Sequence, residues 1–194
     1  MKPIPVIRTA VRIAPDPHRV ITKPFLPGEQ VFPDGQSRAL LIITRILAMA
    51  EADVASTLEA TLNRFGSRHR NLAAALEQHF EIVAHHVDDP AALSRQRRLL
   101  IGAYFTHEYS IEAAALSNPS MVPAADQSGL DPGEQRFIMS VRAVGEGHIS
   151  SIEFRSGVID GDGDITMNEP SRYATTGSRR SPMYDQQVFR TKLD

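Results

Sequence analysis

Polar side chains able to bind oxygen-rich ligands gather between positions 142 and 151. They are Arg142, Glu146, His148, Ser150 and Ser151. A guanidinium group donates hydrogen bonds in a fixed fork, so Arg142 could hold two sugar hydroxyls or a phosphate. His148 and Ser150 follow the next turn and share a strand face, which would let them join Arg142. The alternative is a structural ion pair between Arg142 and Glu146 or Glu153, and the residues alone leave both interpretations open.

A second motif begins like a zinc site but lacks a ligand. His107-Glu108 resembles the start of a zinc-protease helix, yet Ile111 stands where the second histidine is needed, one helical turn further on. We therefore predict no zinc. We interpret Glu108 and Glu112 as an i, i+4 pair on the surface of a helix.

A third motif imitates the start of a calcium-binding loop. Asp160, Asp162 and Asp164 have the spacing of the first EF-hand ligands, but the sixth and twelfth positions hold Ile165 and Ser171 instead of glycine and glutamate. We predict no calcium site here. The Asp-Gly-Asp-Gly sequence at 160–163 is typical of a hairpin turn between two strands.

Composition excludes several classes of protein. With 42% hydrophobic and 23% charged residues and a net charge of −2, the chain has the make-up of a soluble globular protein. It has no cysteine, which excludes disulfides and cysteine nucleophiles. The longest apolar run, 39–43, is far shorter than the roughly 20 residues of a membrane span. The N-terminus has prolines and arginines where a signal peptide needs an apolar stretch, so we expect a cytoplasmic protein without a membrane partner.

Nucleic-acid binding is not expected either. The arginines that could carry it are Arg95, Arg97, Arg98, Arg179 and Arg180. The near-neutral charge and the lack of interleaved aromatic residues oppose this function. We interpret the first three, together with His85 and His86, as residues on the solvated faces of helices.

The apolar pattern predicts helices before the polar stretch. A strand at 6–13 and a short strand at 19–22 lie within a proline-rich arm. Apolar residues then recur at helical spacing over 37–50, 51–64, 71–86 and about 90–104. We expect the last helix to continue, bent, through Ile111 to Leu116.

After this helical part the pattern changes to strands. We predict them at 120–122, 137–144, 149–159 and 165–167. Along 138–144, alternation points Met139, Val141 and Ala143 into the core and puts Arg142 on the other face. The expected fold class is α+β: an extended arm and helical module at 1–116, a small antiparallel sheet at 117–168 and a polar tail at 169–194.

Three stretches of the sequence resemble one known family. They are GAYFTHEYSIEAAAL at 102–116 with the following Ser117-Asn118-Pro119-Ser120, FIMSVRA at 137–143, and GEGHISSIEFRSGVI at 145–159. They resemble the entry into the catalytic domain of glycoside hydrolase family 130, the β-mannoside phosphorylases and β-mannosidases, and by this resemblance the arginine of 137–143 would lie in the sugar-binding cleft. The chain is similar to the N-terminal part of the long bacterial members, which carry a helical extension. The resemblance implies that the sheet is the start of the first blade of a five-bladed β-propeller, incomplete within this chain.

The resemblance also implies a substrate site. Asn118 and Arg142 would contact the mannosyl residue in the subsite before the scissile bond, with His148 and Ser150 as further substrate-binding candidates. We predict no catalytic residue, because the family's general acid is an aspartate in a Glu-Asp-Pro/Ala-Arg type motif that these 194 residues lack. Ser117 also departs from the family, which has an aromatic residue before the Asn-Pro pair.

The expected function is therefore that of the N-terminal portion of a glycosidase or glycoside phosphorylase in carbohydrate metabolism, inactive alone. Inverting cleavage needs an acid and an opposing nucleophile, either water or inorganic phosphate as co-substrate. No cofactor or metal is expected, and the helical module would be a scaffold or a contact within a homo-oligomer. The alternative is a stand-alone helical protein-interaction module whose sheet docks on a partner.

Overall fold

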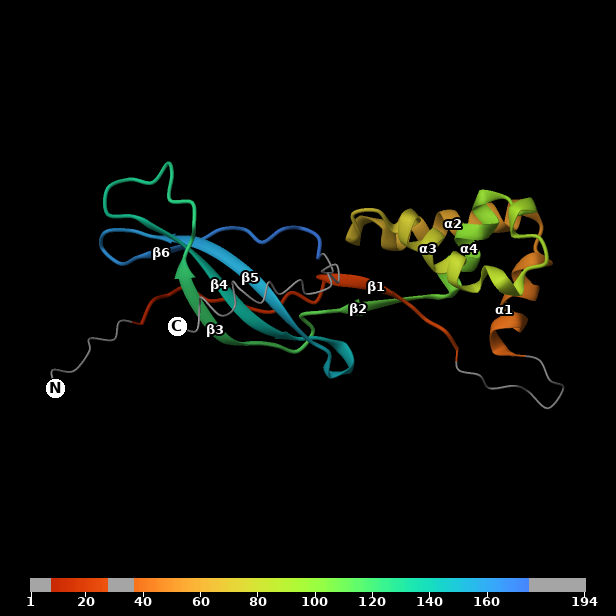
Figure 1. Ribbon diagram of the computed structural model, residues 1–194, viewed down its shortest axis with the longest axis horizontal. Coiled ribbons are helices and arrows are strands. Elements are labelled where there is room, and N and C mark those ends of the chain that lie inside the picture. Colours follow the sequence, from red (N-terminus) through yellow and green to blue (C-terminus); the bar gives the residue numbers. More distant parts are fainter. Residues whose placement is uncertain (1–7, 28–36, 175–194) are drawn as a thin grey trace, which may run out of the picture.

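The computed structural model describes residues 8–27 and 37–174, which form an elongated α+β molecule (Figure 1). Four helices gather at one end, and a four-stranded antiparallel sheet forms the other. A two-stranded antiparallel ribbon lies between them. Neither sheet closes into a barrel within the described residues. The predicted α+β class is confirmed.

The four helices lie close to their predicted positions. They are α1 (Arg38–Leu47), α2 (Glu51–Phe65), α3 (Leu72–Val83) and α4 (Arg95–Tyr104). Short 3₁₀ turns occupy Gly66–Arg68, Ala84–His86 and Pro90–Ala92. Side chains of Ser37, Asn71 and Ser94 cap α1, α3 and α4 by accepting a hydrogen bond from a free backbone N–H of the first turn.

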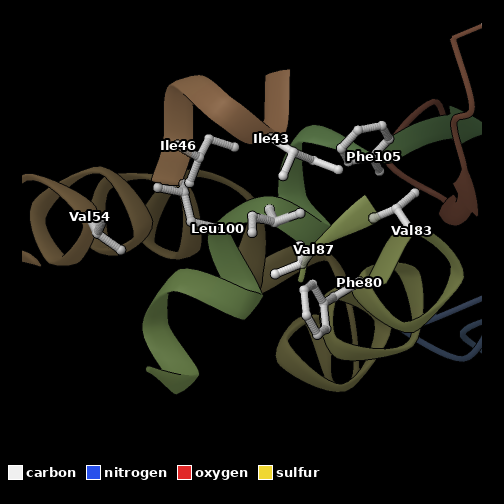
Figure 2. Packing of buried hydrophobic residues seen from close by; sticks show 9 residues of the cluster. Ile43, Ile46, Val54, Phe80, Val83, Val87, Leu100 and Phe105 are labelled. Atoms are coloured by element: carbon white, nitrogen blue, oxygen red, sulfur yellow. The ribbon is translucent and has the colours of Figure 1, made fainter. Parts of the chain in front are cut away.

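The helices enclose a hydrophobic core of two clusters, and α4 contributes side chains to both. Figure 2 shows the larger cluster, in which side chains from all four helices converge; it contains Ile43, Ile46, Val54, Phe80, Val83, Val87, Leu100, Ile101 and Phe105. The smaller cluster contains Leu58, Leu72, Leu76 and Leu99. Burying one such side chain is worth roughly 1.5–3 kcal/mol. The two clusters therefore supply the main stabilisation of the helical part.

Arg97 of α4 is buried, although we expected it on a solvated face. Its guanidinium donates to the backbone carbonyls of Ile46 and Leu47, at the end of α1, and to that of Met49 at 2.8 Å. It also donates to the carboxylate of Glu51 through two nitrogens. Arg97 thus donates to carbonyls at and just after the end of α1, where the helix supplies few partners of its own; that of Ile46 also accepts from the N–H of Met49.

The predicted continuation of the fourth helix through Ile111 to Leu116 is wrong. Helix α4 ends at Tyr104, and strand β2 (Thr106–Ser110) pairs antiparallel with β1 (Val20–Pro24) to form the ribbon. Pairing with a distant strand overrides the helix-forming residues of this stretch. Glu108 and Glu112 therefore do not share a helix face.

The second sheet is a meander in the order β3-β4-β5-β6. Its strands are β3 (Ala115–Pro123), β4 (Gln135–Val144), β5 (Ser150–Ile159) and β6 (Ile165–Met167). All four predicted strands are present, and the first begins earlier than predicted. The predicted hairpin turn between β5 and β6 is confirmed, because the Asp160 carboxylate accepts hydrogen bonds from the N–H groups of Asp162 and Asp164. The described residues hold no cluster of side chains suited to a metal ion.

The two faces of β4 differ as the alternation predicts. Phe137, Met139, Val141 and Ala143 are buried on the inner face, whereas Ile138 and Arg142 are exposed on the outer face. The outer face also carries exposed apolar side chains from the neighbouring strands: Val122 on β3, and Ile152 and Phe154 on β5. We call Val122, Ile138, Ile152 and Phe154 the outer apolar patch.

The described part of the N-terminal arm differs from the prediction. Residues 8–13 form no strand, but the short strand predicted at 19–22 corresponds to β1. The first residues of the strand predicted at 6–13, the polar tail from 175 onward, and Arg179 and Arg180 lie outside the described residues. Among the helices that are described, none has the length and apolar character needed to cross a membrane.

Candidate functional site

Arg142 and Ser150 lie together on the outer face of the meander. The Ser150 hydroxyl oxygen accepts from Nη2 of Arg142 at 3.0 Å and from Nε at 3.3 Å. In the β4–β5 register, Arg142 is opposite Ile152 and Val144 is opposite Ser150, so the two polar side chains are diagonal neighbours. Both are exposed, which leaves the guanidinium accessible to a ligand.

A bulge in β3 brings Asn118 to the same end of the sheet. Ser117 is directly opposite Arg142, and the pairing is then irregular until Ser120 meets Ser140. Asn118 sits within this irregularity with a φ of 51°, a left-handed conformation that asparagine tolerates better than most residues. Bulges re-aim side chains beside functional sites. Asn118 is exposed, one residue from the strand position that faces Arg142.

His148 occupies the turn beside this group. It ends the 3₁₀ turn Glu146–His148 between β4 and β5, has a φ of 60° and is exposed. No hydrogen bond joins its ring to Arg142 or Ser150 in the described residues. The structure therefore joins Arg142 and Ser150 by hydrogen bonds, whereas Asn118 lies in the neighbouring bulge of β3 and His148 in the β4–β5 turn.

The alternative ion pairs of Arg142 do not form in the described structure. Oε2 of Glu146 accepts from the backbone N–H of Ser110 at 3.1 Å, and Oε2 of Glu153 lies 2.9 Å from Nη2 of Arg19. With both carboxylates engaged elsewhere, Arg142 keeps donors for a hydroxyl or a phosphate. The group therefore offers hydrogen-bond donors and acceptors to a ligand.

A buried ionic cluster supports the opposite face of this sheet. It consists of Arg19, Glu112, Glu153 and Arg155, and we call it the buried clasp. Oε1 of Glu112 lies 2.7 Å from Nε of Arg19 and 2.6 Å from Nη2 of Arg155. Glu153 and Arg155 belong to β5, opposite Val141 and Met139 on the inner face of β4. The clasp thus anchors the strands that present Arg142 and Ser150 outward.

The sequence interpretation missed the clasp. Glu112 was expected on an exposed helix surface, yet its side chain is fully buried in the turn between β2 and β3. A charged residue is buried only with partners that satisfy it. Here the partners come from the N-terminal arm and from β5, and nothing local in the sequence indicates them.

The comparisons with known proteins provide no relative for this arrangement. No family model matches the chain, and neither the curated proteins nor the solved structures include a significant match.

Proposed function

We propose that the chain forms the N-terminal, sugar-contacting portion of an enzyme acting on β-mannosides, a glycosidase or glycoside phosphorylase similar to those of glycoside hydrolase family 130. The observation that supports this proposal is the exposed Arg142, hydrogen-bonded to Ser150 on the outer face of the sheet, with Asn118 in the neighbouring bulge of β3. An exposed guanidinium beside an amide and a hydroxyl offers donors and acceptors that match neighbouring sugar hydroxyls. This supports the two substrate contacts, Asn118 and Arg142, that the family resemblance implies.

We further propose that the meander contributes the first blade of a β-propeller. A four-stranded antiparallel sheet is the repeating unit of that architecture, and the order β3-β4-β5-β6 fits it. The outer apolar patch supports this assignment, because Phe154 and Ile152 remain 66% and 60% exposed. A sheet with apolar side chains on both faces is expected to pack a further layer against each.

In this proposal the chain binds but does not turn over substrate. The family's acid motif, Glu-Asp-Pro/Ala-Arg, is absent from the 194 residues, and inverting cleavage needs that acid. The acid and the water or phosphate nucleophile would act at positions that other parts of the enzyme supply.

A titration of the isotope-labelled chain with methyl β-mannoside tests the proposal. We expect saturable amide shifts around Asn118, Arg142 and Ser150, and weaker shifts with methyl β-glucoside. Arg142→Ala should abolish them. Arg45→Ala, which removes an exposed arginine of α1, should leave them unchanged. Absence of shifts at the sheet, or cleavage of an aryl β-mannoside by the chain alone, would contradict the proposal.

The outer apolar patch also favours a second candidate function, a protein-interaction module that docks through this sheet. Large patches of exposed apolar side chains mark sites of protein interaction. This candidate predicts a cooperatively melting monomer or dimer that shows no mannoside-dependent shift. The same titration therefore separates the two functions.

A further inference from the structure

A cavity of about 210 Å³ lies between the helices and the ribbon, on elements that do not contribute to the Arg142 group. Its apolar wall comes from α2, α3 and α4 and consists of Phe65, Leu72, Leu76 and Ala103. The ribbon closes the other side with Thr22, Thr106 and Glu108, and Thr22 lies directly opposite Glu108 in the strand pairing. The cavity thus combines an apolar interior with a polar edge, as small-molecule sites do.

The polar edge centres on the carboxylate of Glu108. Oε2 lies 2.7 Å from Nε2 of His69, and Oε1 lies 2.9 Å from Nη1 of Arg68. The His69 and Glu108 side chains are only 10% and 21% exposed. Each carboxylate oxygen has a lone pair beyond these bonds and can accept one more hydrogen bond. Arg68 already balances the charge of Glu108, so the edge does not require a charged ligand.

Two threonine hydroxyls at the cavity, those of Thr106 and Thr61, can also accept a hydrogen bond from a ligand. Thr106 has one hydroxyl proton, and the two groups next to its oxygen are the carbonyl of Gly102 and Nδ1 of His79, each at 2.7 Å, so the proton is used within the protein. Thr61 donates its proton to the carbonyl of Thr57 at 2.9 Å. Neither hydroxyl has a proton left to give. Together with Glu108 they favour a ligand that donates and disfavour an anion.

We propose that this cavity binds a small neutral molecule that has an apolar ring or chain and one hydroxyl or N–H donor directed at Glu108. A charged ligand would lose its hydration against the apolar walls, which disfavours its binding. The acceptors at the polar edge favour a ligand that donates a hydrogen bond. This site is additional to the proposed mannoside contacts. Its ligand would lie against β1, β2 and three helices at once and so hold the ribbon against the helices.

Three probes of similar size and different charge test the proposal: benzyl alcohol, benzylammonium and benzoate. We would titrate each into the isotope-labelled full chain and follow the amides of Leu72, Ala103 and Thr106. Benzyl alcohol should give saturable shifts there. Benzoate should bind at least about tenfold more weakly, which corresponds to about 1.4 kcal/mol.

Variants separate a specific site from non-specific contact. Ala103→Leu and Thr61→Leu fill the cavity from two different helices, α4 and α2, and each should remove the benzyl alcohol shifts. Ala74→Leu makes the same alanine change at an exposed position of α3 and should have no effect. Glu108→Gln retains the shape of the side chain and should weaken benzyl alcohol binding about fivefold, as expected when a charged acceptor is replaced by a neutral one. A thermal melt of each variant shows whether it is folded. If only one of the two cavity-filling variants folds, that variant is enough for the test.

Three results would overturn the proposal. The first is the absence of saturable shifts at the cavity with benzyl alcohol. The second is persistence of the shifts in a folded filling variant. The third is equal binding of benzoate and benzyl alcohol.

Discussion

Oε1 of Glu112 and Nη2 of Arg155 form a buried ion pair 2.6 Å long. The pair connects the turn that leaves the ribbon to the third strand of the meander, and Arg19 adds the N-terminal arm to the same carboxylate. The buried clasp therefore joins three segments that are far apart in the sequence. It is the main polar link between the ribbon and the sheet that presents Arg142.

We predict that Glu112→Gln destabilises the chain strongly. The substitution retains the volume of the side chain but removes the carboxylate that pairs most closely with both buried arginines, so that among the ion pairs of the described residues only those with Glu153 remain for them. Breaking a buried ion pair in this way costs about 3–5 kcal/mol. Urea denaturation monitored by circular dichroism measures the loss. Glu59→Gln, at an exposed position of α2, serves as the control; equal midpoints for the two variants would contradict the role assigned to the clasp.

Arg97→Ala should also destabilise the chain, through the carbonyls of Ile46, Leu47 and Met49. The carbonyls of Leu47 and Met49 would lose this donor in a partly buried region, whereas that of Ile46 keeps the N–H of Met49. Unsatisfied buried carbonyls cost about 1–3 kcal/mol each. We expect a total loss of about 2–4 kcal/mol in urea denaturation, because water can reach some of them. Arg95→Ala removes an exposed arginine from the same helix and should change stability by less than about 0.5 kcal/mol. A similar small effect for Arg97→Ala would show that the end of α1 needs no such donor.

Two glycine substitutions should have opposite effects. A Cβ at Gly102 would overlap the backbone carbonyl of Leu76, where α4 crosses α3. Gly102→Ala must therefore push the helices apart, and we expect it to cost about 1–3 kcal/mol, as overpacking does. Gly66 has helical torsion angles and open space around it, so Gly66→Ala should stabilise by about 0.4–1 kcal/mol. Thermal melting of the two variants compares them directly. An unchanged melting temperature for Gly102→Ala would contradict the close approach of α4 to α3.

The stability of the chain should decrease as the pH falls below about 6.5. Burial lowers the pKa of His79 below its ordinary value of 6.5, and burial together with the charge of His85 lowers that of His86. Below that pH the unfolded chain binds protons that the folded chain does not, so acid favours unfolding. The melting temperature should fall between about pH 7.5 and about pH 5.5, and less steeply in His79→Asn. An unchanged slope in that variant would exclude His79 as a cause.

The local pattern of the sequence was sufficient for much of the fold. Helical spacing of the apolar residues located the four helices, because this signal lies within a few residues of the chain. Alternation along β4 predicted which side chains are buried, and Asp160 with its glycines predicted the hairpin turn. For the candidate site, the same alternation put Arg142 on the outer face and Ser150 near it.

The remaining features depend on partners that are distant in the sequence. Thr106–Ser110 is a strand because β1 pairs with it, although the residues that follow favour a helix. The sequence by itself therefore determined the helices, the meander strands and their faces, which follow from spacing within one element. Only the tertiary structure decided that Glu112 and Arg97 are buried and that Glu108 edges a cavity, because burial of a charge depends on which distant groups can satisfy it.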